Sequence, residues 1–123
     1  MRHGLYFPNF AIFGDPDVVV RIATTAEAAG WDGVFPWDHI QAGHWAGPVI
    51  DPWVAMAAVA TATKRIKFGP MVTPIPRRRP AKLARETVTL DHLSGGRLIL
   101  GVGIGWPPDV DFEHFGDAAD NRV

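Results

Sequence analysis

The chain has 123 residues and a mass of 13.4 kDa, which matches one ordinary domain and excludes two independent ones. Hydrophobic residues make up 47% of it and charged residues 20%, a composition typical of a globular protein. A formal charge of -1 argues against binding nucleic acid or an anionic membrane through bulk charge, and the absence of cysteine excludes disulfides and thiolate metal sites.

Nothing in the sequence predicts a membrane span or a signal peptide. The most apolar stretch, residues 53–62, is far shorter than the roughly 20 residues that a span needs. At the N-terminus, Pro8 and Asn9 interrupt the chain before an apolar signal core could form. We therefore expect a cytoplasmic protein.

The first half of the chain predicts two strand–helix units of the same design. Residues 5–7 form a short apolar strand stopped by a proline, and residues 31–37 return to strand character. Each strand is followed by an Asp-Pro pair, Asp15-Pro16 and Asp51-Pro52, which is typical of a helix N-cap and first turn. The first helix carries apolar residues at spacing four: Val18, Ile22 and Ala26.

The second half predicts two more strands and a third helix. Residues 66–73 form the third strand, and a helix that begins at Pro80 places Leu83, Thr87 and Leu90 on one face. Ser94-Gly95-Gly96 ends this helix, and residues 97–102 follow at once as a fourth strand.

The strand beginnings recur about every 30 residues, the length of a βαβ unit, which indicates an α/β fold with a parallel sheet. A closed (β/α)8 barrel takes about 250 residues, so four units amount to its N-terminal half. We therefore expect residues 1–123 to form one partial barrel domain. Its two unpaired sheet edges predict completion by another chain or by a missing C-terminal half.

Asp38 and His39 follow the second strand, at the end of the sheet where parallel barrels place their active sites. His39 is a candidate general acid or base, with Asp38 orienting it or contacting the ligand. The alternative is that Asp38 caps a turn and His39 binds backbone in the loop. His39 and His44, with Asp51 or His3, do not have the spacing of a metal site, so we predict none.

Residues 101–105 read Gly-Val-Gly-Ile-Gly, which resembles a dinucleotide-binding loop. Trp106 stands where that fingerprint needs its last glycine, so this interpretation fails. The glycines still allow a flat ring system or a phosphate to approach the backbone, or a strand corner to pack tightly.

Three prolines in residues 69–76 stiffen the end of the third strand and suggest a rigid shelf beside a ligand. For the Arg77-Arg78-Arg79 run that follows, we expect a solvated helix entry rather than a phosphate site. Tryptophans near predicted strand ends and loops suggest a pocket for an aromatic ligand.

Residues 31–39, 69–80 and 90–106 together resemble the luciferase-like monooxygenase family. The most specific part is the run Leu-Asp-x-Leu-Ser-Gly-Gly-Arg at 90–97, and the similarity covers nearly the whole chain. The resemblance implies a (β/α)8 barrel that uses reduced FMN with oxygen, or the deazaflavin F420, to oxidise or reduce small organic substrates.

The resemblance also assigns residues. His39 corresponds to the family's active-site histidine, with Asp38 beside it, and Met71-Val72 corresponds to a non-prolyl cis peptide bond that lies against the flavin ring. The expected cofactor-binding residues are Met71, Val72, Gly103, Gly105 and Trp106.

From these residues we expect a luciferase-like, flavin-dependent monooxygenase or oxidoreductase that takes FMN and a small organic substrate. F420 is the alternative cofactor, and a non-catalytic half-barrel that assembles through its sheet edges is the alternative function. Residues 113–123 look like the opening of the family's next segment. We expect the active protein to be a homo-oligomer or to include a C-terminal half that this chain lacks.

Overall fold

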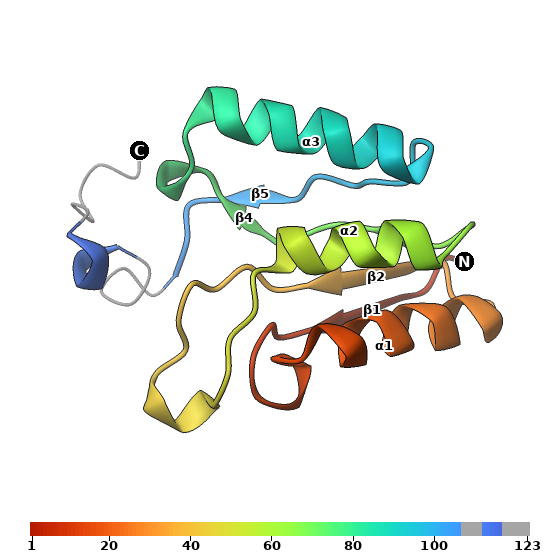
Figure 1. Cartoon of the computed structure of the whole chain (residues 1–123), viewed down its shortest axis with the longest axis horizontal. Helices are drawn as coiled ribbons and strands as arrows, with labels where there is room; N and C mark the ends of the chain where they lie inside the picture. The colour runs from red at the N-terminus through yellow and green to blue at the C-terminus, as the bar shows by residue number, and fades with distance from the viewer. Residues whose placement is uncertain (107–111, 117–123) are drawn as a thin grey trace.

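The computed structural model describes residues 1–106 and 112–116, and it alternates strands with helices as the sequence predicts (Figure 1). The helices are α1 Pro16–Ala28, α2 Pro52–Ala62 and α3 Pro80–Ser94. The strands are β1 Gly4–Phe7, β2 Gly33–Pro36, β3 Lys67–Phe68, β4 Thr73–Pro74 and β5 Val102–Gly103. Short 3₁₀ turns are η1 Ala11–Phe13, η2 His44–Ala46, η3 Ile75–Arg77 and η4 Glu113–Phe115. The predicted segment at 117–123 lies outside the described residues.

All strand pairs of the described residues are parallel, which confirms the α/β class. The order is β1-β2-β3, β4 pairs with β5, and a bridge from Phe68 to Leu98 joins the two groups. The predicted third and fourth strands are interrupted, and each forms regular pairs over only part of its length. A Cβ built on Gly69 would lie 1.7 Å from the carbonyl oxygen of Ile99, so the backbones here are too close for regular pairing of side-chain-bearing residues.

The helix starts follow the predicted caps. The Asp15 carboxylate accepts a hydrogen bond from the backbone N–H of Asp17 at 2.9 Å. Asp51 accepts from the N–H groups of Trp53 and Val54 at 2.8 and 3.1 Å. Gly95, in the left-handed conformation, ends α3. The starts of α1 and α2 and the end of α3 are therefore set locally by the sequence.

The buried face of α1 differs from the predicted one. The residues it buries are Val19, Ala23 and Ala26, whereas Val18 and Ile22 are only partly buried. Because residues 18–20 are all valine, the apolar face of α1 is wider than the part that the core can cover. Packing against α2 and the sheet determines which residues of that face are buried.

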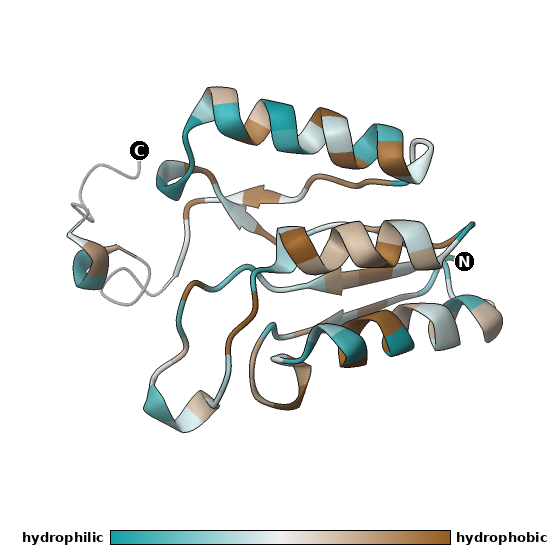
Figure 2. Cartoon of the chain, viewed as in Figure 1, coloured by the Kyte–Doolittle hydropathy of each residue, from teal (hydrophilic) through white to brown (hydrophobic). Residues whose placement is uncertain are grey.

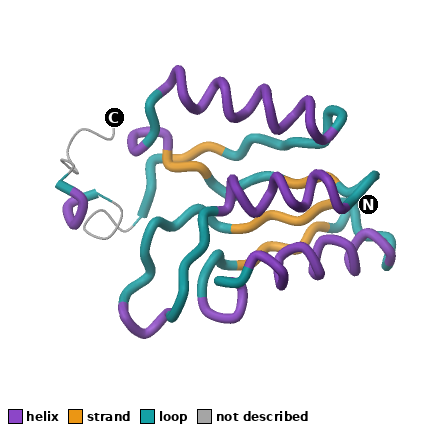
Figure 3. Tube along the Cα trace, in the orientation of Figure 1, coloured by secondary structure: helices purple, strands orange, loops and turns teal. Residues whose placement is uncertain are grey.

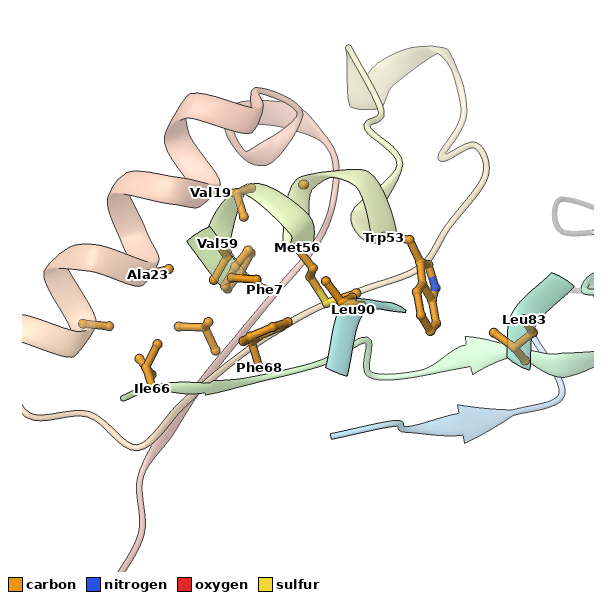
Figure 4. Close-up of a cluster of buried hydrophobic side chains, with 14 residues drawn as sticks. Phe7, Val19, Ala23, Trp53, Met56, Val59, Ile66, Phe68, Leu83 and Leu90 are labelled. Atoms are coloured by element: carbon orange, nitrogen blue, oxygen red, sulfur yellow. The ribbon is translucent and has the colours of Figure 1, made fainter. Parts of the chain in front are cut away.

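The three helices lie side by side along the strands, and the main core fills the space between them and the sheet (Figures 3 and 4). In Figure 2, α2 is largely apolar, as expected for a helix with neighbours on both sides. The large buried side chains include Trp53, Met56, Ile66 and Phe68. Within the described part of the chain, no helix combines the length and apolar character that a membrane crossing requires.

Arg97 is buried at the amino ends of the strands, where helices end. Its guanidinium donates to the carbonyl oxygens of Ala60, Ile66 and Ser94 at 2.6, 3.1 and 2.7 Å, and to the Thr63 hydroxyl at 2.7 Å. Ala60 and Ser94 lie in the last turns of α2 and α3, whose dipoles favour a cation there. Through Arg97, the Ser-Gly-Gly-Arg run therefore links the last turns of α2 and α3, which is a structural role.

Candidate active site

A cavity of about 530 Å³ lies at the carboxyl ends of the strands, the end that carries η2, η3 and η4 in Figure 1. It gathers residues that the sequence placed in three separate segments. Six of the seven predicted site residues line it, together with Tyr6, Trp37, Pro74 and Ile104. The six are Asp38, His39, Met71, Val72, Gly105 and Trp106.

Met71 and Val72 form a shelf on one side of this cavity. The peptide bond between them is cis, as the resemblance implied. The shelf is tied to β2 on one side and to the residue before β5 on the other, because the N–H of Met71 donates to the Pro36 carbonyl at 2.9 Å and the N–H of Thr73 donates to the Gly101 carbonyl at 2.9 Å. Both shelf side chains are partly exposed, at 42% and 38%, so they offer apolar surface to a ligand.

Gly103, the seventh predicted residue, is not among the lining residues. A Cβ at this position would lie 2.6 Å from Cγ2 of Val72. The missing side chain therefore leaves room for Val72, and the strand corner packs tightly as one of the sequence interpretations held. Gly105 lines the cavity and has φ +85, a backbone conformation that favours glycine.

Asp38 is buried and surrounded by hydrogen-bond donors. Arg77 and Arg78 donate to its carboxylate at 3.0 and 2.8 Å, and the Trp53 indole donates at 3.2 Å. Arg77 also donates to the Asp38 carbonyl oxygen at 2.7 Å. The expectation of a solvated arginine run is thus wrong for Arg77 and Arg78, whose side chains are 7% and 19% exposed, and it holds for Arg79. A buried carboxylate without such partners would be strongly destabilising.

These contacts define what Asp38 can do. Its two carboxylate oxygens are engaged by Arg77, Arg78 and Trp53, in a position where the side chain is 2% exposed. The arrangement holds the segment before α3 against the segment after β2. It favours a role in shaping the cavity over transfer of a proton.

His39 is half-buried and lies among aromatic rings. Its ring centroid is 5.5 Å from Trp37 and 6.1 Å from Phe10. Its backbone is held by the side chain of Asn9, which accepts from the His39 N–H at 3.2 Å and donates to the His39 carbonyl at 2.8 Å. Sequence reasoning missed Asn9, because a single asparagine after a strand has no pattern that points to such contacts.

The other candidates lie apart from the cavity. Trp45 is 73% exposed on η2, with its ring 5.8 Å from that of Phe10. His44 is exposed beside it. Across residues 1–106 and 112–116, the structure has no group of three acidic, histidine or cysteine side chains that could hold a metal ion.

The family model for luciferase-like monooxygenases matches residues 6–123. The chain belongs to the luciferase-like monooxygenase family. Among solved structures, the FMN-bound oxygenating constituent of 3,6-diketocamphane monooxygenase, a type II Baeyer-Villiger monooxygenase of Pseudomonas putida, superposes with a TM-score of 0.81 at 29% identity. The match covers 100% of this chain and 36% of that one.

Curated relatives of this luciferase-like chain use different chemistry. It is 36% identical over 116 residues to 4-hydroxyprotoasukamycin monooxygenase of Streptomyces nodosus subsp. asukaensis, a match that covers 94% of this chain and 29% of the relative. It is 42% identical over 102 residues to an F420-dependent glucose-6-phosphate dehydrogenase of Amycolatopsis mediterranei, covering 76% and 28%. The chain thus spans less than a third of the length of these two relatives.

Proposed function

We propose that the chain forms the cofactor-facing part of a flavin-dependent oxidoreductase that acts on a small organic substrate, with FMN as the first candidate cofactor and F420 as the second. The observation that carries the proposal is that His39, the Met71–Val72 shelf and the Gly105–Trp106 corner line the same cavity. These segments are far apart in the sequence, and the fold brings them together at the carboxyl ends of the strands.

The cavity fits a flat, largely apolar ring system. Its volume of about 530 Å³ lies within the roughly 300–1,000 Å³ of small-molecule sites. The shelf side chains offer an apolar surface to one face of such a ring. Gly105 has no Cβ, so the strand end allows a ring edge to approach the backbone closely.

When bound, reduced FMN supplies electrons for the activation of oxygen, and reduced F420 supplies a hydride. The residues of this chain bind, orient and protonate. We propose that the His39 imidazole holds or moves a proton at a ring nitrogen beside the cavity. Trp37 and Phe10 restrict the orientation of that ring, and Asp38 keeps the arginine-bearing segment in place.

A complete site needs more protein on this face. Cavity residues Tyr6, Val72 and Ile104 are 57%, 38% and 58% exposed, and β1 and β5 are edge strands within the described residues. We propose that further β/α units, from a C-terminal half or from a second copy, cover this face in the active protein. The competing function, a non-catalytic assembly module, rests on the same open edges.

The test is a titration of the purified chain with FMN and with F420, followed by cofactor fluorescence while light scattering gives the mass. Saturable binding of one cofactor is expected, and failure of both to bind in every oligomeric state would contradict the proposal in favour of the assembly module. In an active assembly, His39→Ala should lower turnover about 10²–10⁴-fold while changing cofactor affinity less. The matched control is His44→Ala, at an exposed loop histidine; unchanged turnover in His39→Ala would remove the proton-transfer role.

A further inference from the structure

We infer that Asn9 is a positioning residue: its buried amide holds the backbone of His39 at the cavity and closes both ends of the 39–50 loop. The inference rests on the proposed function only for its consequence in catalysis. The positioning itself is a property of the described contacts.

Asn9 follows β1 and is fully buried, with 0% exposure. A primary amide has two N–H donors and a carbonyl acceptor, and burying it costs free energy unless these groups are paired. All of them are paired here. Nδ2 donates to the carbonyl oxygens of His39 and Ile50 at 2.8 and 2.7 Å, and Oδ1 accepts from the His39 N–H at 3.2 Å.

The orientation of the amide follows from its partners. Two of its contacts are carbonyl oxygens, which need donors, and one is an N–H, which needs an acceptor. A flipped amide would place oxygen against oxygen, so the orientation is determined by the hydrogen bonds.

The amide engages His39 as a neighbouring strand would, through both its N–H and its carbonyl. A separate bond from the N–H of Ile50 to the main-chain carbonyl of Asn9, at 3.0 Å, completes the clamp. His39 and Ile50 are the two ends of the loop that carries η2, and they are 30 and 41 residues away from Asn9. One side chain therefore fixes where the loop leaves the cavity and where it enters α2.

Asn9 acts through His39 and not on a ligand. It is not among the residues that line the cavity, and it has no exposed surface. By holding the His39 backbone, it limits the positions that the imidazole reaches between Trp37 and Phe10. Displacement of a catalytic group by about 1 Å can lower a rate by roughly 10²-fold, so such support has a functional effect.

Amide hydrogen exchange tests the positioning without any cofactor. In the wild type, the His39 amide should be protected although it lies outside every helix and strand. Asn9→Ala should speed its exchange about tenfold or more relative to the Ile50 amide, whose main-chain acceptor is retained. Asn9→Asp replaces the donor with an oxygen that faces the carbonyl oxygens of His39 and Ile50, so it should not restore the His39 protection.

The control is Ser94→Ala, which removes side-chain hydrogen bonds to the backbone at the opposite end of the sheet and should leave His39 exchange unchanged. Exchange of the wild-type His39 amide at the rate of an unstructured peptide would overturn the inference even if no variant folds. Equal acceleration at His39 and Ile50 in Asn9→Ala would also overturn it.

In an active assembly, Asn9→Ala should lower kcat and alter its pH profile in the same sense as His39→Ala, whereas Ser94→Ala should not. A wild-type pH profile in Asn9→Ala would overturn the catalytic consequence. If the wild type binds neither FMN nor F420, the proposed function fails, and the exchange result still decides the role of Asn9.

Discussion

The two ends of the sheet both bury arginine, and they balance its charge in different ways. At the amino end, the Arg97 guanidinium is surrounded by neutral oxygens, three of them backbone carbonyls. At the carboxyl end, Arg77 and Arg78 converge on the carboxylate of Asp38. The first arrangement joins the ends of α2 and α3, and the second joins two segments that border the cavity.

This difference indicates that Arg97 supports the fold, whereas Asp38 and its arginines support the cavity. Backbone carbonyls at helix ends exist in any strand–helix repeat, so Arg97 uses what the fold already provides. The carboxylate of Asp38 is a specific side chain in a loop, and its removal takes away a counter-charge that two guanidiniums share. Disturbance at the amino end should therefore change stability alone, whereas disturbance at the carboxyl end should change both stability and cofactor binding.

The largest effect is expected from Asp38→Asn. The substitution keeps the shape but removes the charge between two largely buried guanidiniums, which should lower the free energy of unfolding by about 3–5 kcal/mol. Urea unfolding followed by circular dichroism measures the change. Asp15→Asn is the control, since asparagine caps a helix as well as aspartate does. A loss no larger than that of the control would contradict the pairing.

Arg97→Met should have the next largest effect. It removes the donor from the carbonyls of Ala60, Ile66 and Ser94, and leaving buried acceptors unpaired should cost about 2–3 kcal/mol. Arg21→Met, at an exposed position on α1, is the control. Under conditions where the variant is folded, its cofactor affinity should match the wild type. An affinity as low as that of Asp38→Asn would break the proposed separation of the two ends.

Much of the fold was predictable because its signals are local. The caps at Asp15 and Asp51 and the stop at Gly95 act within a few residues, and the structure confirms them. The meeting of His39 with the Met71–Val72 shelf was also predictable, because strand ends of a parallel sheet gather on one side.

The contacts that the sequence did not reveal are long-range. Arg77 and Arg78 reach Asp38 across 39 and 40 residues, and Asn9 reaches His39 across 30. A run of three arginines is most often solvated, and only the path of the folded chain brings a carboxylate to two of them. The roles of the site residues in binding and catalysis stay predictions.

Gly103→Ala tests how tightly β5 packs against the Met71–Val72 shelf at the carboxyl end of the sheet. The new methyl group would lie 2.6 Å from Cγ2 of Val72, so the shelf must move, at a cost of about 1–2 kcal/mol in unfolding free energy. We expect cofactor affinity to fall about tenfold, which titration measures. The double variant Gly103→Ala with Val72→Ala should recover stability, because it removes the overlapping atoms. A single variant with unchanged affinity and stability would show that the corner adapts freely.

Glu27→Gln tests a negative charge at the amino end of the sheet, where Arg97 carries a positive one. Its expected effect on stability is the smallest of these predictions. The Glu27 carboxylate accepts hydrogen bonds from the backbone N–H groups of Lys64, Arg65 and Ile66 at 2.6–3.1 Å. Burial opposes its ionisation, but these hydrogen bonds and the charge of Arg65 outweigh burial and hold the pKa of Glu27 below its usual value of 4.5. As with Arg97, a charge at this end is held mainly by the backbone.

The depressed pKa determines the sign of the pH dependence. Because the folded-state pKa lies below the unfolded-state pKa, the stabilisation is fully present above the unfolded value and is lost as the pH falls through the folded value. Glu27→Gln should therefore cost about 1 kcal/mol near pH 7 and progressively less below pH 4.5. Urea unfolding at several pH values measures this, with Glu86→Gln on α3 as the control for a carboxylate that pairs with Lys82 at the surface. A difference between wild type and Glu27→Gln that stays constant down to low pH would mean that shape, and not charge, is what the backbone N–H groups recognise.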